Sequence, residues 1–115
     1  MSTRLHVIVP CYNPPSGWEQ TLAAHFQGFQ QASKGLFEDL KLVVVMDGTS
    51  THTQSANFDR LQELLPNVAI VDYPANRGKG YALRQGVAGT DADFWMVVAC
   101  MVHSPKLRKL ASGGA

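Results

Sequence analysis

The chain has 115 residues, of which 45% are hydrophobic and 17% are charged, and its net charge is +1. These values describe one folded domain and exclude a multidomain assembly, a disordered chain and a fibrous repeat. A charge so close to zero also supplies no field that would favour nucleic acid or an anionic membrane as a partner.

Two further features of the composition concern the compartment. The longest apolar run, residues 94–102, is about half as long as a membrane-spanning helix, and the first residues do not form a signal peptide. We therefore predict no transmembrane segment and a cytoplasmic protein. Cys11 and Cys100 each lie within an apolar stretch, which favours buried, reduced thiols over a disulfide or a zinc site.

Four short apolar runs rich in β-branched residues predict four strands. In chain order they are residues 5–10, 42–46, 68–71 and 94–98. Their apolarity is continuous rather than alternating, which is typical of parallel strands that are covered on both faces.

Three helices are predicted between these strands. The first follows a capping-box spacing at residues 16–19, and its apolar side chains recur at helical intervals over about four turns. The second covers residues 55–65 and is ended by Pro66, and the third begins near Gly78.

Strands that alternate with helices predict an α/β fold, with an open, mostly parallel sheet and helices on both of its faces. We expect the strand order 3-2-1-4. The domain is predicted to span residues 1–105, followed by a basic, Gly-rich tail at residues 106–115.

In open parallel sheets, ligands bind beyond the carboxyl ends of the strands. The first segment at that edge contains Pro10, Tyr12 and Asn13. The Tyr12 ring could stack on a base, and the Asn13 side chain could bond backbone groups of the loop. The alternative interpretation is a Pro-rich turn that only ends a strand.

The second segment at this edge begins at Asp47, directly after four apolar residues and before Gly48. Its carboxylate could accept hydrogen bonds from the amide or imide edge of a base. The alternative is a carboxylate that caps a turn or a helix.

The third segment, Asn-Arg-Gly-Lys-Gly at residues 76–80, carries two glycines at a predicted helix start. Arg77, Lys79 and Arg84 add three positive charges with no acid among them, which favours a phosphate site. The residue directly after Lys79 is Gly80 rather than Ser or Thr, so the segment is not a Walker loop. A Gly-rich turn with solvated cations is the alternative.

Three motifs in this order resemble the family 2 glycosyltransferases of the GT-A fold. They are VIVPCYN at residues 7–13, VVVMDGTS at 43–50 and NRGKGYALRQG at 76–86, within a resemblance that spans about residues 5–105. The resemblance implies a Rossmann-like domain that binds a nucleotide sugar of the UDP or GDP type. It places Tyr12 by the base, a hydrogen bond from Asp47 to that base, and Lys79 near the diphosphate. The implied donor-binding residues are Pro10, Tyr12, Asn13, Asp47, Lys79 and Arg84.

The chain departs from this family in its metal motif. The family is expected to carry an Asp-x-Asp pair that holds Mg or Mn, but those places fall on Ala99 and Met101. Asp91 and Asp93 have the right spacing, yet they precede the fourth strand and would lie at the opposite edge of the sheet. We therefore predict no metal ligands in this chain.

Two more departures concern catalysis. Met46 stands where the family usually has the first of two acids, and the chain stops before the acceptor-binding half that provides the catalytic base. No catalytic residue can be named, so we expect a truncated donor-binding half that is inactive alone. The alternative function is a non-catalytic module that binds nucleotide weakly or self-associates through exposed apolar surface.

Overall fold

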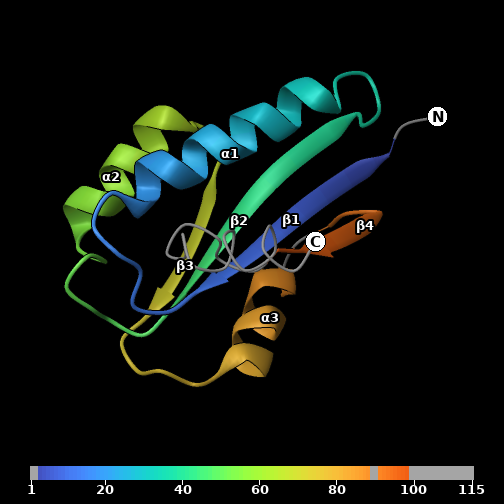
Figure 1. Cartoon of the computed structure of the whole chain (residues 1–115). Helices are drawn as coiled ribbons and strands as arrows, with labels where there is room; N and C mark the ends of the chain where they lie inside the picture. Colours follow the sequence, from blue (N-terminus) through green and yellow to red (C-terminus); the bar gives the residue numbers. More distant parts are fainter. Residues whose placement is uncertain (1–2, 89–90, 99–115) are drawn as a thin grey trace, which may run out of the picture.

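The computed structural model describes residues 3–88 and 91–98. Strands and helices alternate along the chain (Figure 1). Their order is β1 (Arg4–Cys11), α1 (Trp18–Ala32), β2 (Asp39–Asp47), α2 (Ser55–Leu64), β3 (Ala69–Tyr73), α3 (Lys79–Val87) and β4 (Phe94–Val97).

All four strands belong to one parallel sheet with the order β3-β2-β1-β4. Helices α1 and α2 cover one face of the sheet, and α3 lies against the other (Figure 1). The expected fold class and strand order are therefore confirmed. Each strand runs in the same direction, so the loops that follow them share one edge.

The larger core lies between the sheet and helices α1 and α2. Trp18 is fully buried there, and its indole N–H donates a 2.6 Å hydrogen bond to the carbonyl oxygen of His52. The Phe58 ring of α2 meets the Trp18 ring edge-on, with 6.3 Å between centroids. This packing fixes the start of α1 against the loop that follows β2.

The smaller core lies under α3, where Ile8, Val43, Val45 and Ala82 are buried. Gly86 lets this helix approach the sheet closely, because a Cβ atom at that position would be 2.6 Å from Ile8 Cγ2. Gly86, the last residue of the third motif, is therefore explained by close packing, and it sets the position of α3 on the sheet.

The capping box expected at residues 16–19 is wrong. Helix α1 begins after Gly17, whose φ is 79°, and no side chain caps it. Glu19 is instead fully buried, and its Oε2 accepts hydrogen bonds of 2.9 Å from Asn57 Nδ2 and from the Arg60 guanidinium. A buried carboxylate needs such partners, so Glu19 joins α1 to α2 rather than capping its own helix.

The remaining predictions from the sequence concern the two cysteines, the C-terminal tail and membrane-spanning helices. Cys11 is buried, as expected, whereas Cys100 and the tail at residues 106–115 lie outside the described residues. Within residues 3–88 and 91–98, no helix combines the length and the apolarity needed to cross a membrane.

Candidate functional site

The strand register brings the three motif segments to one edge of the sheet. Cys11 pairs with Met46, and Asp47 pairs with Tyr73, at the carboxyl ends of β1, β2 and β3. Tyr12 follows Cys11 directly, so the Tyr12 backbone lies next to the end of β2, where Asp47 is located.

Asp47 ties the end of β2 to the loop between β3 and α3. Its Oδ1 accepts a 2.8 Å hydrogen bond from the Arg77 backbone N–H, and its Oδ2 accepts one of 3.0 Å from the Gly78 N–H. The Asn76 side-chain amide donates to the Asp47 carbonyl oxygen at 3.3 Å. Asp47 is only 4% exposed, so in this structure its carboxylate holds a turn.

The same two loops are also in direct backbone contact. Gly48 has a φ of 103°, and a Cβ atom there would lie 3.2 Å from the backbone nitrogen of Asn76. One residue further on, the Thr49 N–H donates to the Pro74 carbonyl oxygen at 3.1 Å. A left-handed glycine is required because a side chain would be strained and would press on Asn76.

Helix α3 begins next to this anchored turn. Its N-cap is Gly78, and no side chain caps it, so the first N–H groups of α3 lack intrahelical partners. Lys79 is the first residue of α3 and is exposed. The Arg84 guanidinium reaches back to the same end, because its Nη1 lies 3.6 Å from the position that a Gly80 Cβ would take.

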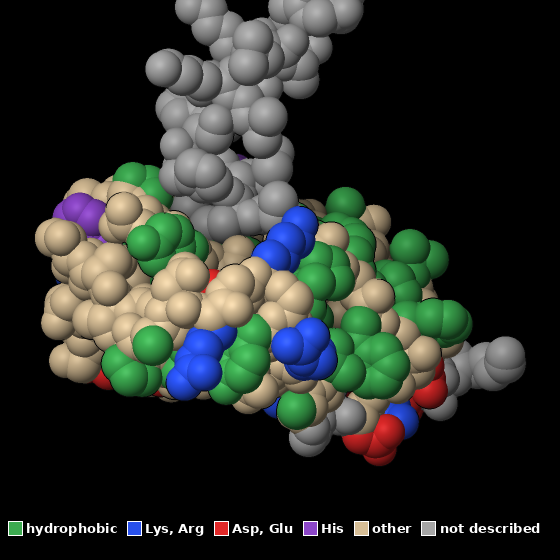
Figure 2. Space-filling view, turned by 90° about the horizontal axis from the view of Figure 1, so that it is seen from below, with side chains coloured by type: hydrophobic (Ala, Val, Ile, Leu, Met, Phe, Trp, Pro, Cys, Tyr) green, Lys and Arg blue, Asp and Glu red, His purple; other side chains and the backbone are tan. Residues whose placement is uncertain are grey.

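The cations at this edge are not neutralised by nearby acids. Within the described part of the chain, neither Arg77, Lys79 nor Arg84 forms an ion pair. Figure 2 shows Lys and Arg side chains spread over the face on which α3 lies, with a group of acidic side chains at one end of the view. The arrangement leaves positive charge and free backbone N–H groups where an anion could bind.

Two tyrosines that the sequence analysis did not single out lie beside this loop. The rings of Tyr73 and Tyr81 meet edge-on at 5.1 Å, and the Arg77 guanidinium lies 5.6 Å from the Tyr81 ring centroid. The Tyr73 hydroxyl is buried without a hydrogen-bond partner among the described residues. Burial raises the pKa of Tyr73, and the neighbouring Asp47 carboxylate raises it further. Tyr73 pairs with Asp47 in the strand register, and this pairing is the signal that could have identified Tyr73 as a residue near the site.

The segment after β1 exposes an aromatic side chain at this edge of the sheet. Pro10 is half-buried within β1, and Tyr12 is 63% exposed. Asn13 has a left-handed backbone with φ of 47°, which asparagine tolerates better than most residues. The Tyr12 ring is therefore accessible for stacking, while Pro10 and Asn13 set the course of the loop.

Asp91 and Asp93 lie at the other end of the sheet. The Arg4 N–H donates to Asp93 Oδ2 at 2.8 Å, and the Arg4 guanidinium forms ion pairs with Asp91 at 3.3 Å and with Asp93 at 3.9 Å. Residues 3–88 and 91–98 contain no cluster of three or more His, Cys, Asp or Glu that could hold a metal ion. Ala99 and Met101 lie outside the described residues.

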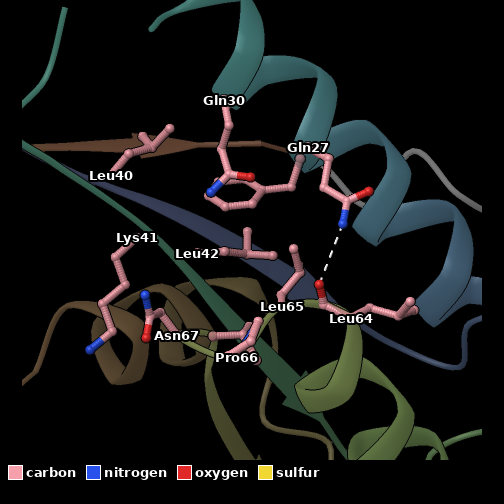
Figure 3. Close-up of a pocket in the computed structure, with 11 residues that line it drawn as sticks. Gln27, Gln30, Leu40, Lys41, Leu42, Leu64, Leu65, Pro66 and Asn67 are labelled. Carbon is pink, nitrogen blue, oxygen red and sulfur yellow. Dashed lines mark hydrogen bonds between the residues drawn. The ribbon is translucent and has the colours of Figure 1, made fainter. Parts of the chain in front are cut away.

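Two hollows of the surface lie away from the motif loops. One, of about 140 Å³, lies at the amino end of β2 between α1 and the end of α2, where the Gln27 amide donates to the Leu64 carbonyl oxygen at 3.4 Å (Figure 3). Another, of about 210 Å³, is an apolar groove between α1 and strands β1 and β4, lined among others by Phe29 and Met96. Neither of these two hollows is lined by the loops that carry the three motifs.

Comparison with known proteins identifies the family of the chain. No curated protein matches the chain in sequence. The family model described as Glycosyl transferase family 2 matches residues 6–101, which cover all three motifs and every described strand except the first residues of β1. Because this match spans most of the chain and agrees with the observed sheet, the chain belongs to glycosyl transferase family 2.

Proposed function

We propose that the chain binds a nucleoside diphosphate sugar at the carboxyl edge of the sheet, as the donor for transfer of a sugar to an acceptor that is unknown. Members of this family generally use nucleotide-sugar donors. The observation that carries the proposal is the uncapped start of α3, which lies beside cations that have no ion pairs among the described residues.

Each part of a nucleoside diphosphate has a counterpart at this edge. The N–H groups at the start of α3, with Lys79 and Arg84, suit the diphosphate. The exposed Tyr12 ring suits the base, and Pro10 and Asn13 shape the loop that presents it. Asp47 belongs to the same site through the turn that it holds.

The family generally uses divalent metals, but the described residues at this edge do not fit one. Asp47 is almost fully buried and each of its carboxylate oxygens already accepts a backbone N–H, while Asp91 and Asp93 are paired with Arg4 at the other edge. We therefore propose donor binding without a metal, and assign no catalytic step to a described side chain.

The second candidate function is a non-catalytic module that self-associates. It is favoured by the exposed apolar side chains of β4, since Phe94 is 62% exposed and Val97 is 48% exposed. Sedimentation analysis distinguishes the two, because a strict monomer at high concentration would count against self-association. A binding measurement with nucleotides tests the first candidate.

That measurement is calorimetric titration with UDP and GDP at low salt. We expect binding, and we expect Lys79→Ala to weaken it about tenfold, or ~1.4 kcal/mol, through the loss of one charge-assisted contact. Lys34→Ala is the matched control, because Lys34 is an exposed lysine in the loop before β2, at the opposite edge. If neither nucleotide binds at millimolar concentration, the proposal fails.

A further inference from the structure

The Asp47 carboxylate is buried and already hydrogen-bonded in this structure, so a ligand has little access to it. Its two oxygens accept the N–H groups of Arg77 and Gly78 at 2.8 and 3.0 Å, and the residue is 4% exposed. A base edge could reach these oxygens only if the turn moved away. The hydrogen bonds instead connect the end of β2 to the two peptide groups that immediately precede α3.

These bonds decide where α3 begins. Gly78 is the N-cap with a φ of 93°, a backbone conformation that glycine adopts readily and that other residues rarely adopt. Asn76 adds its own bond to the Asp47 carbonyl oxygen, and Gly48 packs against the Asn76 backbone. The turn is therefore held from β2 at several points, and Lys79 follows it directly.

We infer that Asp47 is a positioning residue for the diphosphate and does not read the base. It holds the 76–78 turn so that the first N–H groups of α3 and the Lys79 ammonium face the same anion. The inference rests on the proposed function, and it deepens that function by making the diphosphate, rather than a particular base, the recognised part of the donor. Stacking on Tyr12 suits this selectivity, because every base has a face that can stack on an aromatic ring.

The two possible roles of Asp47 predict opposite changes in the affinity for an anion when its charge is removed. A carboxylate close to a diphosphate repels it, so replacement of an idle Asp47 by a neutral residue would raise the affinity for any anion. If Asp47 instead holds the turn, the same replacement loosens the donors and lowers that affinity. The direction of the change therefore separates the two roles.

The test compares UDP, GDP and inorganic pyrophosphate, titrated into the unsubstituted chain and into Asp47→Asn by calorimetry. We expect Asp47→Asn to lower the affinity for all three ligands by a similar factor of about ten. Loss of UDP and GDP binding with pyrophosphate binding unchanged or strengthened would overturn the inference while leaving the proposed function intact. Failure of the unsubstituted chain to bind any of the three would contradict the proposed function, and the positioning role with it.

A second variant keeps the carboxylate in place. Asn76→Ala removes the amide that bonds to the Asp47 carbonyl oxygen, and we expect it to weaken pyrophosphate and nucleotide binding together, although less than Asp47→Asn does. A base-reading Asp47 would predict no loss of pyrophosphate binding. Amide hydrogen exchange gives a readout without ligand: exchange at Arg77 and Gly78 should accelerate in Asp47→Asn and stay unchanged in the control Asp93→Asn. Unchanged exchange at both amides would overturn the inference.

Discussion

The two edges of the sheet treat their acidic residues differently. At the amino edge, Asp91 and Asp93 are exposed and pair with the Arg4 guanidinium. At the carboxyl edge, Asp47 is buried and is compensated by backbone N–H groups instead of a cation. The amino edge therefore pairs its acids with a cation, whereas Arg77, Lys79 and Arg84 at the carboxyl edge form no ion pair among the described residues, which favours an anionic ligand at the carboxyl edge.

The largest expected difference between the edges is in stability. Asp47→Ala removes two charge-assisted hydrogen bonds and should lower the free energy of unfolding by about 3 kcal/mol. Asp93→Ala removes one backbone hydrogen bond and a weak, exposed ion pair, so its cost should be at most about 1 kcal/mol. Urea unfolding followed by circular dichroism measures both. Equal losses would show that the two acids are held in the same way.

Acid should weaken the amino half of the sheet. His6 is buried and its Nδ1 has no hydrogen-bond partner among the described residues. Burial lowers the pKa of His6, as do the nearby charges of Lys41 and Arg4, while Asp39 and Asp91 oppose the shift. The neutral ring is thus favoured in the folded state, so its contribution to stability is present above about pH 6.5 and is lost as the pH falls.

His6→Leu tests this contribution. Below about pH 6.5 the unfolding free energy should fall by up to about 1.4 kcal/mol per pH unit in the unsubstituted chain, and less steeply in the variant. Urea titrations at pH 7 and pH 5 supply the comparison. Parallel pH profiles for the two proteins would exclude His6 as the source.

Alkali should weaken the carboxyl edge, through Tyr73. Burial and the Asp47 carboxylate raise the pKa of Tyr73, so the folded state favours the protonated phenol. This contribution is present below about pH 10 and is lost as the pH rises further. Thermal unfolding between pH 8 and pH 11 should show a flatter decline for Tyr73→Phe, and the same decline in both proteins would contradict the assignment.

The smallest expected effect is that of a metal. Nucleotide affinity should be nearly the same with and without Mn, because both Asp47 oxygens already accept backbone N–H groups, Asp91 and Asp93 pair with Arg4 at the other edge, and residues 3–88 and 91–98 hold no cluster of three or more His, Cys, Asp or Glu that could bind a metal ion. Asp91→Ala and Asp93→Ala should also leave it unchanged. A metal-dependent affinity that either substitution abolishes would show that the amino edge takes part in binding.

The contrast between the edges also shows what the sequence can predict. The strands, their order and the meeting of three loops follow from apolar runs and turn residues, which act locally or through the parallel topology. The partners of Asp47 and Glu19 do not, because they lie 30 or more residues away and depend on how a loop or a second helix packs. Glu19 has the spacing of a capping residue, yet burial beside Arg60 changes its role.

Donor binding at the carboxyl edge of the sheet is tested most directly by locating where the diphosphate binds. Titration of the isotope-labelled chain with UDP, followed by amide chemical shifts in two-dimensional NMR, tests this residue by residue. We predict shifts at Tyr12 and at residues 77–80, with the amides of Arg4 and residues 91–93 unchanged. Shifts concentrated at Arg4 and residues 91–93, or no shifts at millimolar UDP, would contradict it.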